Sequence, residues 1–155
     1  MKIIGYALIM IAFASVGLFK NSEINHKILY SYAYFDFICL VREKIALWRL
    51  PLTKIYENLN NEELDNLGFL KTLRTQGLEK AFKSIEHKLI IDGSHLDFCK
   101  MLGTMPLTET VKLCDEEIKK LEFEIREKKA ALEKKSKLYP ALGILAGVAT
   151  VILIL

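Results

Sequence analysis

The chain has 155 residues, of which 52% are hydrophobic and 26% are charged, with a net charge of +3 at pH 7. The near balance of 22 basic and 19 acidic residues argues against a dedicated nucleic-acid-binding protein. Three scattered cysteines exclude a disulfide framework, and their odd number favours a reducing compartment. Because the long apolar runs occur only at the two ends, we also exclude a purely soluble enzyme, a disordered tail and a multi-span transporter.

The first predicted element is a transmembrane helix over residues 1–19. Ile3–Phe19 is a run of 17 residues without a charge, and 14 of them are hydrophobic. At a rise of about 1.5 Å per residue, this run covers about 26 Å, near the lower limit for a bilayer core. A cleaved signal peptide is the alternative, since Ala12 and Ala14 fit the small-x-small cleavage pattern. The apolar run continues past that pattern to Phe19, which favours the span.

Residues 20–137 are predicted to form a soluble helical domain. Prolines and glycines interrupt its apolar pattern, and we expect Pro51 and Gly103 to form turns between helices. We interpret Trp48 as a core residue or a membrane-interface anchor. Elsewhere the apolar residues recur in steps of three or four, as helix faces require. Two such faces are Ile38, Val41, Ile45, Trp48 and Leu52, and Leu78, Phe82, Ile85 and Leu89.

Two stretches of the domain need a closer look at their secondary structure. Tyr30–Phe37 alternates in polarity and is rich in aromatic residues, which is a strand signal. Because no second strand of comparable quality lies nearby to pair with it, we predict a helix and an all-α domain. Ser94 to Asp97 predicts a helix start, with the Ser94 side chain as the cap and Asp97 reaching back.

A long helix is predicted from Leu107 to Tyr139, because this stretch holds no proline or glycine. Its apolar seam follows a heptad spacing and permits two interpretations. The seam packs on the domain's own N-terminal helix, which we favour, or it forms a coiled-coil stalk with a partner. The seam consists of Leu107, Val111, Cys114, Ile118, Leu121 and Ile125.

The second predicted transmembrane helix covers residues 138–155, which carry no charge. The residues just before it are basic, so the positive-inside rule places the domain in the cytoplasm. Gly143 and Gly147 form a GxxxG pattern, which predicts close helix packing either between the two spans or between two copies of the chain. Glycine is also simply common in membrane helices. The basic residues are Arg126, Lys128, Lys129, Lys134, Lys135 and Lys137.

No pattern for catalysis or for a cofactor stands out. There is no glycine-rich phosphate loop, no GxSxG and no HExxH in the chain. His95 and Cys99 are four residues apart on a predicted helix, with His87 and Asp92 upstream, which is the beginning of a metal site. With no second ligand pair, chance proximity is the better explanation. We therefore expect no enzyme activity, metal or cofactor.

Several short stretches resemble the stage III sporulation protein AB family of endospore-forming bacteria, over nearly the whole chain. The most specific lies at the C-terminal end, where Lys137-Leu138-Tyr139 is followed by Leu142-Gly143, Leu145 and Gly147. The opening Lys2-x-x-Gly5-x-x-Leu8-Ile9, the Ile45 to Pro51-Leu52 step, and Leu102-Gly103 are also similar to that family.

The resemblance implies a two-span protein in the mother-cell membrane around the forespore. Its helical domain would be similar to the cytoplasmic domains of the type II secretion inner-membrane platform protein. The chain would then serve as a platform or adaptor in the mother cell–forespore channel complex, next to a secretion-type ATPase. The alternative, based on the residues alone, is a generic membrane-anchored helical coiled-coil scaffold unrelated to sporulation.

Overall fold

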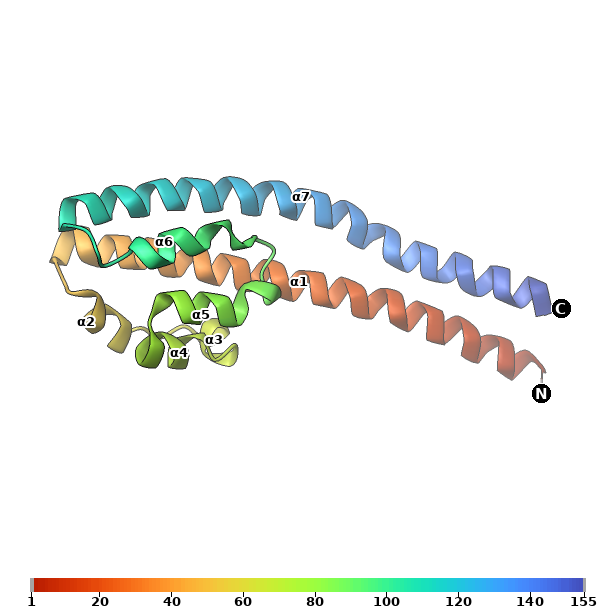
Figure 1. The fold of residues 1–155 in the computed structure, drawn as a ribbon. Helices are drawn as coiled ribbons and strands as arrows, with labels where there is room; N and C mark the ends of the chain where they lie inside the picture. The colour runs from red at the N-terminus through yellow and green to blue at the C-terminus, as the bar shows by residue number, and fades with distance from the viewer. Residues whose placement is uncertain (1, 155) are drawn as a thin grey trace. The chain divides into compact units, whose positions relative to one another are not determined.

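The computed structural model describes the backbone of residues 2–154. It describes the side chains of residues 15, 19–135, 138, 141–142, 144–146, 148–150 and 152. All regular structure in this part of the chain is helical, which confirms the all-α prediction. The elements in chain order are α1 (Lys2–Trp48), α2 (Leu52–Glu57), α3 (Glu62–Asn66), α4 (Phe69–Gln76), α5 (Leu78–Ile85), η1 (Glu86–Lys88), η2 (Gly93–His95), α6 (Leu96–Met101) and α7 (Leu107–Ile154) (Figure 1).

The chain divides into two compact units, unit 1 with residues 1–26 and 129–155, and unit 2 with residues 27–128. In unit 1 the backbone is helical at every described residue, and α7 continues through Pro140 without a break. Among the described residues, no helix offers a stretch both apolar and long enough to traverse a bilayer. Most side chains of the predicted spans 1–19 and 138–155 lie outside the described residues, so both spans stay a prediction.

The core of unit 2 is built on α1. Tyr34 is fully buried, and its ring centroid lies 6.0 Å from that of Phe69 on α4 and 5.2 Å from that of Phe82 on α5. Ile38 and Val41 are also fully buried, one turn and two turns further along α1. The stretch Tyr30–Phe37 is therefore helical, as predicted, because its inward-facing aromatic residues continue the face formed by Ile38 and Val41.

The predicted apolar face of α1 stops at Ile45, which is earlier than expected. Trp48 is the last residue of the helix and is 64% exposed, so the interpretation of Trp48 as a core residue is wrong. Leu52 belongs to α2. The helix ends because Arg49 adopts a left-handed conformation (φ 48°), and the Leu50 amide donates back to the Lys44 carbonyl over 3.5 Å. The Arg49 amide also donates to the Ile45 carbonyl over 3.1 Å, which is the hydrogen bond of a left-handed (αL) C-cap.

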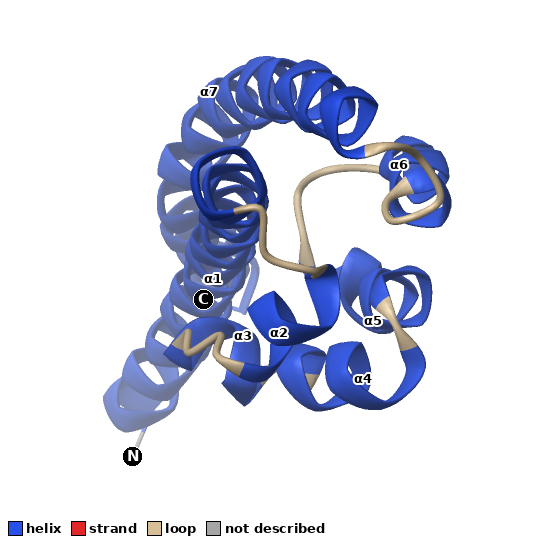
Figure 2. Ribbon diagram, turned by 90° about the vertical axis from the view of Figure 1, so that its left-hand side faces the viewer, coloured by secondary structure: helices blue, strands red, loops and turns tan. Residues whose placement is uncertain are grey.

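The short helices α2 to α5 lie together on one side of the bundle, joined by brief loops (Figure 2). Their ends have local causes. The Asn61 side chain accepts a hydrogen bond from the Leu64 amide over 3.0 Å and so caps α3. Gly77 separates α4 from α5 with a φ of 84°. Each of these helices buries at least one apolar residue in the core, among them Ile55, Leu64, Leu73 and Ile85.

In unit 2, α7 packs against its own domain. Cys114, Leu121 and Ile125 of the predicted seam are buried, whereas Leu107 at the start of the helix is 48% exposed. The Arg42 guanidinium of α1 donates to the Asp115 carboxylate of α7 over 2.8 Å, which joins the two helices directly. The single long helix is confirmed, and the burial of its seam fits packing on α1 rather than a separate stalk.

Candidate functional site

The most unusual buried side chain in unit 2 is that of His95, at the end of the short helix η2. Its imidazole is completely buried and lies between two carboxylates. Nδ1 lies 2.6 Å from Oε1 of Glu117, and Nε2 lies 2.6 Å from Oε2 of Glu124. The two glutamates are seven residues apart on α7, and therefore on one helix face. His95 thus anchors the segment that begins α6 onto α7.

Two further charged residues complete what we call the His95 cluster, namely Asp92 and Lys128. Oε1 of Glu124 accepts from the Asp92 amide over 3.0 Å and from Nζ of Lys128 over 2.5 Å. Nζ of Lys128 also lies 3.8 Å from Oδ2 of Asp92. The cluster therefore holds three carboxylates, one ammonium and one imidazole. Among the described residues, every fully buried side-chain nitrogen and oxygen atom has a hydrogen-bond partner.

The same region corrects the predicted helix start at Ser94. The Asp92 side chain, rather than that of Ser94, forms the cap and accepts from the Ser94 amide over 2.8 Å. The chain enters a 3-10 turn before α6, and α6 itself has no side-chain cap. Aspartate two residues before an amide forms this turn readily, so it starts the helical segment earlier than the serine would.

The electrostatics favour a charged imidazole in the folded protein. Burial lowers the pKa of His95, but its hydrogen bonds to Glu117 and Glu124 outweigh burial and leave that pKa raised. Burial raises the pKa of Glu124, whereas its hydrogen bonds from Lys128 and His95 leave it lowered overall. Both ring nitrogens face carboxylate oxygens, and the two can donate hydrogen bonds at the same time only when the ring is protonated. The cluster is therefore a buried ion-pair network.

Asp92, His95 and Glu124 are close enough to share a metal ion, since one ligand atom from each lies within 4.8 Å of the others. The hydrogen-bonded geometry does not favour this. Ligand atoms around a tetrahedral zinc lie about 3.3 Å apart, given bonds of about 2.0 Å. The 2.6 Å separation of Nε2 of His95 from Glu124 is a hydrogen bond instead. A metal would also have to displace the Lys128 ammonium.

The other two residues of the predicted metal pattern lie apart from this arrangement. His87 is exposed on η1. Cys99 is buried, with its sulfur 3.4 Å from the Tyr34 hydroxyl, and burial raises the pKa of its thiol to about 12. A thiol with so high a pKa is a poor metal ligand at neutral pH. The spacing of His95 and Cys99 thus reflects core packing.

The His95 cluster predicts that stability falls as the pH rises above neutral. Because the pKa of His95 is raised on folding, its contribution is complete below the unfolded pKa and is lost as pH rises through the folded pKa. In that interval the free energy of unfolding falls by up to about 1.4 kcal/mol per pH unit. Urea unfolding between about pH 6 and pH 9 measures this, taking the unfolded pKa as about 6.5. In His95→Gln the fall should be absent, and an identical fall in both proteins would contradict the assignment.

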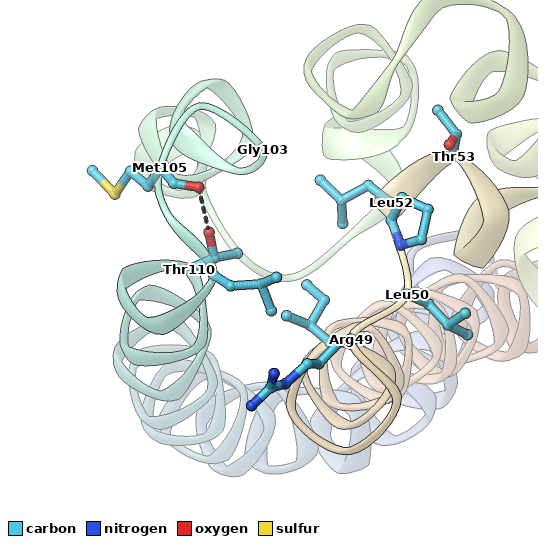
Figure 3. A pocket seen from close by; sticks show the side chains of 10 residues that line it. Arg49, Leu50, Leu52, Thr53, Gly103, Met105 and Thr110 are labelled. Carbon is cyan, nitrogen blue, oxygen red and sulfur yellow. Dashed lines mark hydrogen bonds between the residues drawn. The ribbon is translucent and has the colours of Figure 1, made fainter.

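At the other end of α6 the two predicted turn residues, Pro51 and Gly103, line one cavity of about 400 Å³ (Figure 3). The cavity lies between the end of α1, the start of α2 and the loop that joins α6 to α7. The Thr110 hydroxyl holds this loop by donating to the carbonyls of Met105 (3.2 Å) and Pro106 (3.0 Å). The lining of the cavity is mainly apolar, and the other residues that line it are Ile45, Leu50, Leu52 and Leu107, with Arg49 and Thr53 as polar members.

Gly103 is required by its backbone and by its surroundings. Its φ is 91°, a conformation that L side chains rarely adopt, and an added Cβ would lie 2.8 Å from Cδ1 of Leu52. We expect Gly103→Ala to lower the free energy of unfolding by about 2 kcal/mol, from the strained backbone and the displaced leucine. Thermal unfolding measures the loss. Gly93→Ala is the control, since Gly93 does not have a positive φ and an added Cβ there makes only an ordinary contact at 3.7 Å. Equal stability of both variants would contradict this interpretation.

Sequence reasoning missed Glu117, Glu124 and Arg49. Glu117 lies on the seam side of α7, three residues after Cys114, and a carboxylate within an apolar seam was a usable signal. Arg49 had a weaker signal, as the residue between a helix end and Leu50-Pro51. The predicted packing of Gly143 and Gly147 lies outside the described side chains. Their backbone is helical in α7, and the packing stays a prediction.

A comparison with protein families finds a match over nearly the whole chain. The family model described as stage III sporulation protein AB covers residues 2–155. No curated protein and no solved structure matches the chain.

Proposed function

The chain belongs to the stage III sporulation protein AB family, and from this premise we propose that it is a membrane platform or adaptor of the mother cell–forespore channel complex. In this role it contacts a secretion-type ATPase on the cytoplasmic side. The observation that carries the proposal is the family match along the chain from residue 2 to residue 155. This is a sporulation family and not a known family of enzymes.

The structure of unit 2 supports a binding role over a catalytic one. Its buried charges, in the His95 cluster, are paired with each other, and they hold α6 on α7 instead of facing a substrate-sized cavity. The cavity of about 400 Å³ at the other end of α6 is lined mainly by apolar residues. A rigid helical surface with an apolar depression is suited to protein recognition.

Membrane attachment through residues 1–19 and 138–155 is part of the proposal, with the bilayer as the first partner. It is supported by the two uncharged apolar runs of the sequence and by the basic residues before the second run. Gly143 and Gly147 would bring the spans, or two copies of the chain, into close contact.

Cysteine labelling of the full chain in growing cells tests the cytoplasmic placement. Cys99 and Cys114 are buried and Cys39 is partly buried, so their failure to react is uninformative. A variant with these three replaced by alanine and with Lys88→Cys offers one exposed thiol in unit 2. We expect an impermeant maleimide to label this thiol only after the membrane is permeabilised. Labelling in intact cells would contradict the cytoplasmic placement.

Localisation of the ATPase in sporulating cells tests the adaptor role. A fluorescent ATPase should concentrate at the membrane around the forespore when the chain is present, and should become diffuse when its gene is deleted. Restoring the full chain should restore the membrane signal. An unchanged ATPase distribution in the deletion strain would contradict the proposal and favour a generic helical scaffold.

A further inference from the structure

We propose that the end of unit 2 around Arg49 binds an acidic amphipathic helix of a partner protein. The partner's helix places one of its apolar side chains in the cavity beside Gly103 and one of its carboxylates against the Arg49 guanidinium. This rests on the proposed function, since an adaptor must bind another protein, and it names the surface and the chemistry of contact. We call this surface the Arg49 surface, defined by Arg49, Leu47, Trp48, Leu107 and the cavity.

The Arg49 surface is apolar and open. The cavity of about 400 Å³ has a neighbour of about 340 Å³, and Ile45, Arg49 and Leu107 line both. Two apolar residues of these linings are exposed, Leu107 at 48% and Leu50 at 36%, and at the end of α1 Leu47 and Trp48 are 69% and 64% exposed. A cluster of exposed apolar side chains next to hollows is typical of a protein-binding surface.

Arg49 supplies the charge beside the two cavities, while the Lys44 ammonium lies 5.9 Å from the centre of the Trp48 ring. Arg49 is the single charged residue in the linings of the two cavities. No hydrogen bond or ion pair engages its guanidinium within the described residues. Two other arginines of unit 2 are engaged, since Arg42 donates to Asp115 over 2.8 Å and Arg74 donates to the Leu59 carbonyl over 2.6 Å. A guanidinium without a partner beside an apolar hollow matches a carboxylate next to an apolar side chain.

The backbone conformation of Arg49 also supports a binding role for this residue. Its φ of 48° is in the left-handed region, where glycine is the usual residue at a helix end. An arginine here is strained, and strain of this kind concentrates at functional positions. Figure 3 shows the Arg49 side chain leaving the end of α1 at the edge of the cavity.

A protein helix fits this surface better than a lipid headgroup does. Arg49 follows the end of α1, and the part of α1 within unit 2, from Lys27 to Trp48, is about 32 Å long. Within unit 2, Arg49 therefore lies at the opposite end of this helix from Lys27, where the chain enters the unit. On an amphipathic helix, residues three or four apart place an apolar side chain and a carboxylate side by side.

Photo-crosslinking in sporulating cells tests the proposal with the full chain. Leu107→benzoylphenylalanine places the reactive group at the cavity, and mass spectrometry identifies the crosslinked peptide. We expect a peptide with Asp or Glu within one helical turn of the crosslinked residue. The crosslink yield should fall by about tenfold or more in Arg49→Gly and Arg49→Glu, the loss expected when a charged hydrogen bond is removed. Arg49→Gly relieves the strained backbone, so its lower yield would not reflect unfolding.

Lys88→Glu is the control, because Lys88 is an exposed cation on η1, next to the segment whose Ile90 amide binds Ser31 near the start of unit 2. Its yield should equal that of the unaltered protein. The proposal is overturned by a crosslink to lipid, by a peptide without acidic residues, by no protein crosslink at all, or by a yield unaffected in the Arg49 variants. A crosslink to an acidic helix in a protein other than the ATPase would support the Arg49 surface, while the localisation experiment above tests the ATPase contact separately.

Discussion

Replacing His95 with alanine is expected to lower the free energy of unfolding by about 3–5 kcal/mol, because it leaves buried carboxylates without their counter-charge. Glu117 is 5% exposed and has the imidazole of His95 as its hydrogen-bond partner. Glu124 retains Lys128, so the loss should come mainly from Glu117. Urea unfolding of the full chain at pH 7, followed by circular dichroism, measures the effect.

His87→Ala is the matched control for His95→Ala, since His87 is an exposed histidine on η1, eight residues earlier. It should change the free energy of unfolding by no more than about 0.5 kcal/mol. The loss in His95→Ala should also shrink in acid, where protonation of the unpaired carboxylate removes its charge. A loss that is the same at pH 4 and pH 7 would mean that His95 acts through packing and not through charge.

Replacing Phe82 with alanine is the second large expected effect, again a loss of about 3–5 kcal/mol. Phe82 is fully buried, and its ring lies 5.2 Å from Tyr34 and 6.4 Å from His95 between centroids. Its removal therefore opens a cavity at the centre of unit 2, next to the His95 cluster. Differential scanning calorimetry should show a large fall in the unfolding temperature.

Phe123→Ala provides the comparison for Phe82→Ala, because Phe123 on α7 is 64% exposed. We expect this variant to remain within about 0.5 kcal/mol of the unaltered protein. Losses of similar size in the two variants would contradict the packing described for unit 2, since the same side chain would then matter equally inside and outside the core.

Local periodicity was sufficient to predict most of the helices. Tyr34, Ile38 and Val41 share a face of α1 because apolar residues in steps of three and four can be buried together only on a helix. The absence of proline and glycine likewise identified the long helix α7 within the domain. These predictions depend on neighbours in the sequence, which is why they could be made without a structure.

The candidate site depends on long-range contacts, and these could not be predicted in the same way. His95 meets Glu117 and Glu124 across 22 and 29 residues of sequence. Pro51 and Gly103 could each be predicted as a turn, but nothing local indicates that both line one cavity. The left-handed conformation of Arg49 departs from the usual preference for glycine at a helix end, so propensity argued against it.

The His95 cluster and the Arg49 surface are linked through α6. This helix has six residues, too few to be stable alone, and depends on its contacts with the rest of unit 2, where Phe98 and Cys99 are buried. His95 anchors its first turn to α7, and Gly103 follows its last turn at the cavity. We infer that the cluster keeps one wall of the Arg49 surface in place, so its role is in positioning and not in chemistry.

Co-purification from sporulating cells tests the adaptor role most directly. The full chain, tagged and solubilised from membranes in a mild detergent, should bring down the secretion-type ATPase of the channel complex. The ATPase should be absent from a parallel purification of an unrelated tagged membrane protein. Recovery of the intact chain with its other membrane partners, but repeatedly without the ATPase, would contradict the account.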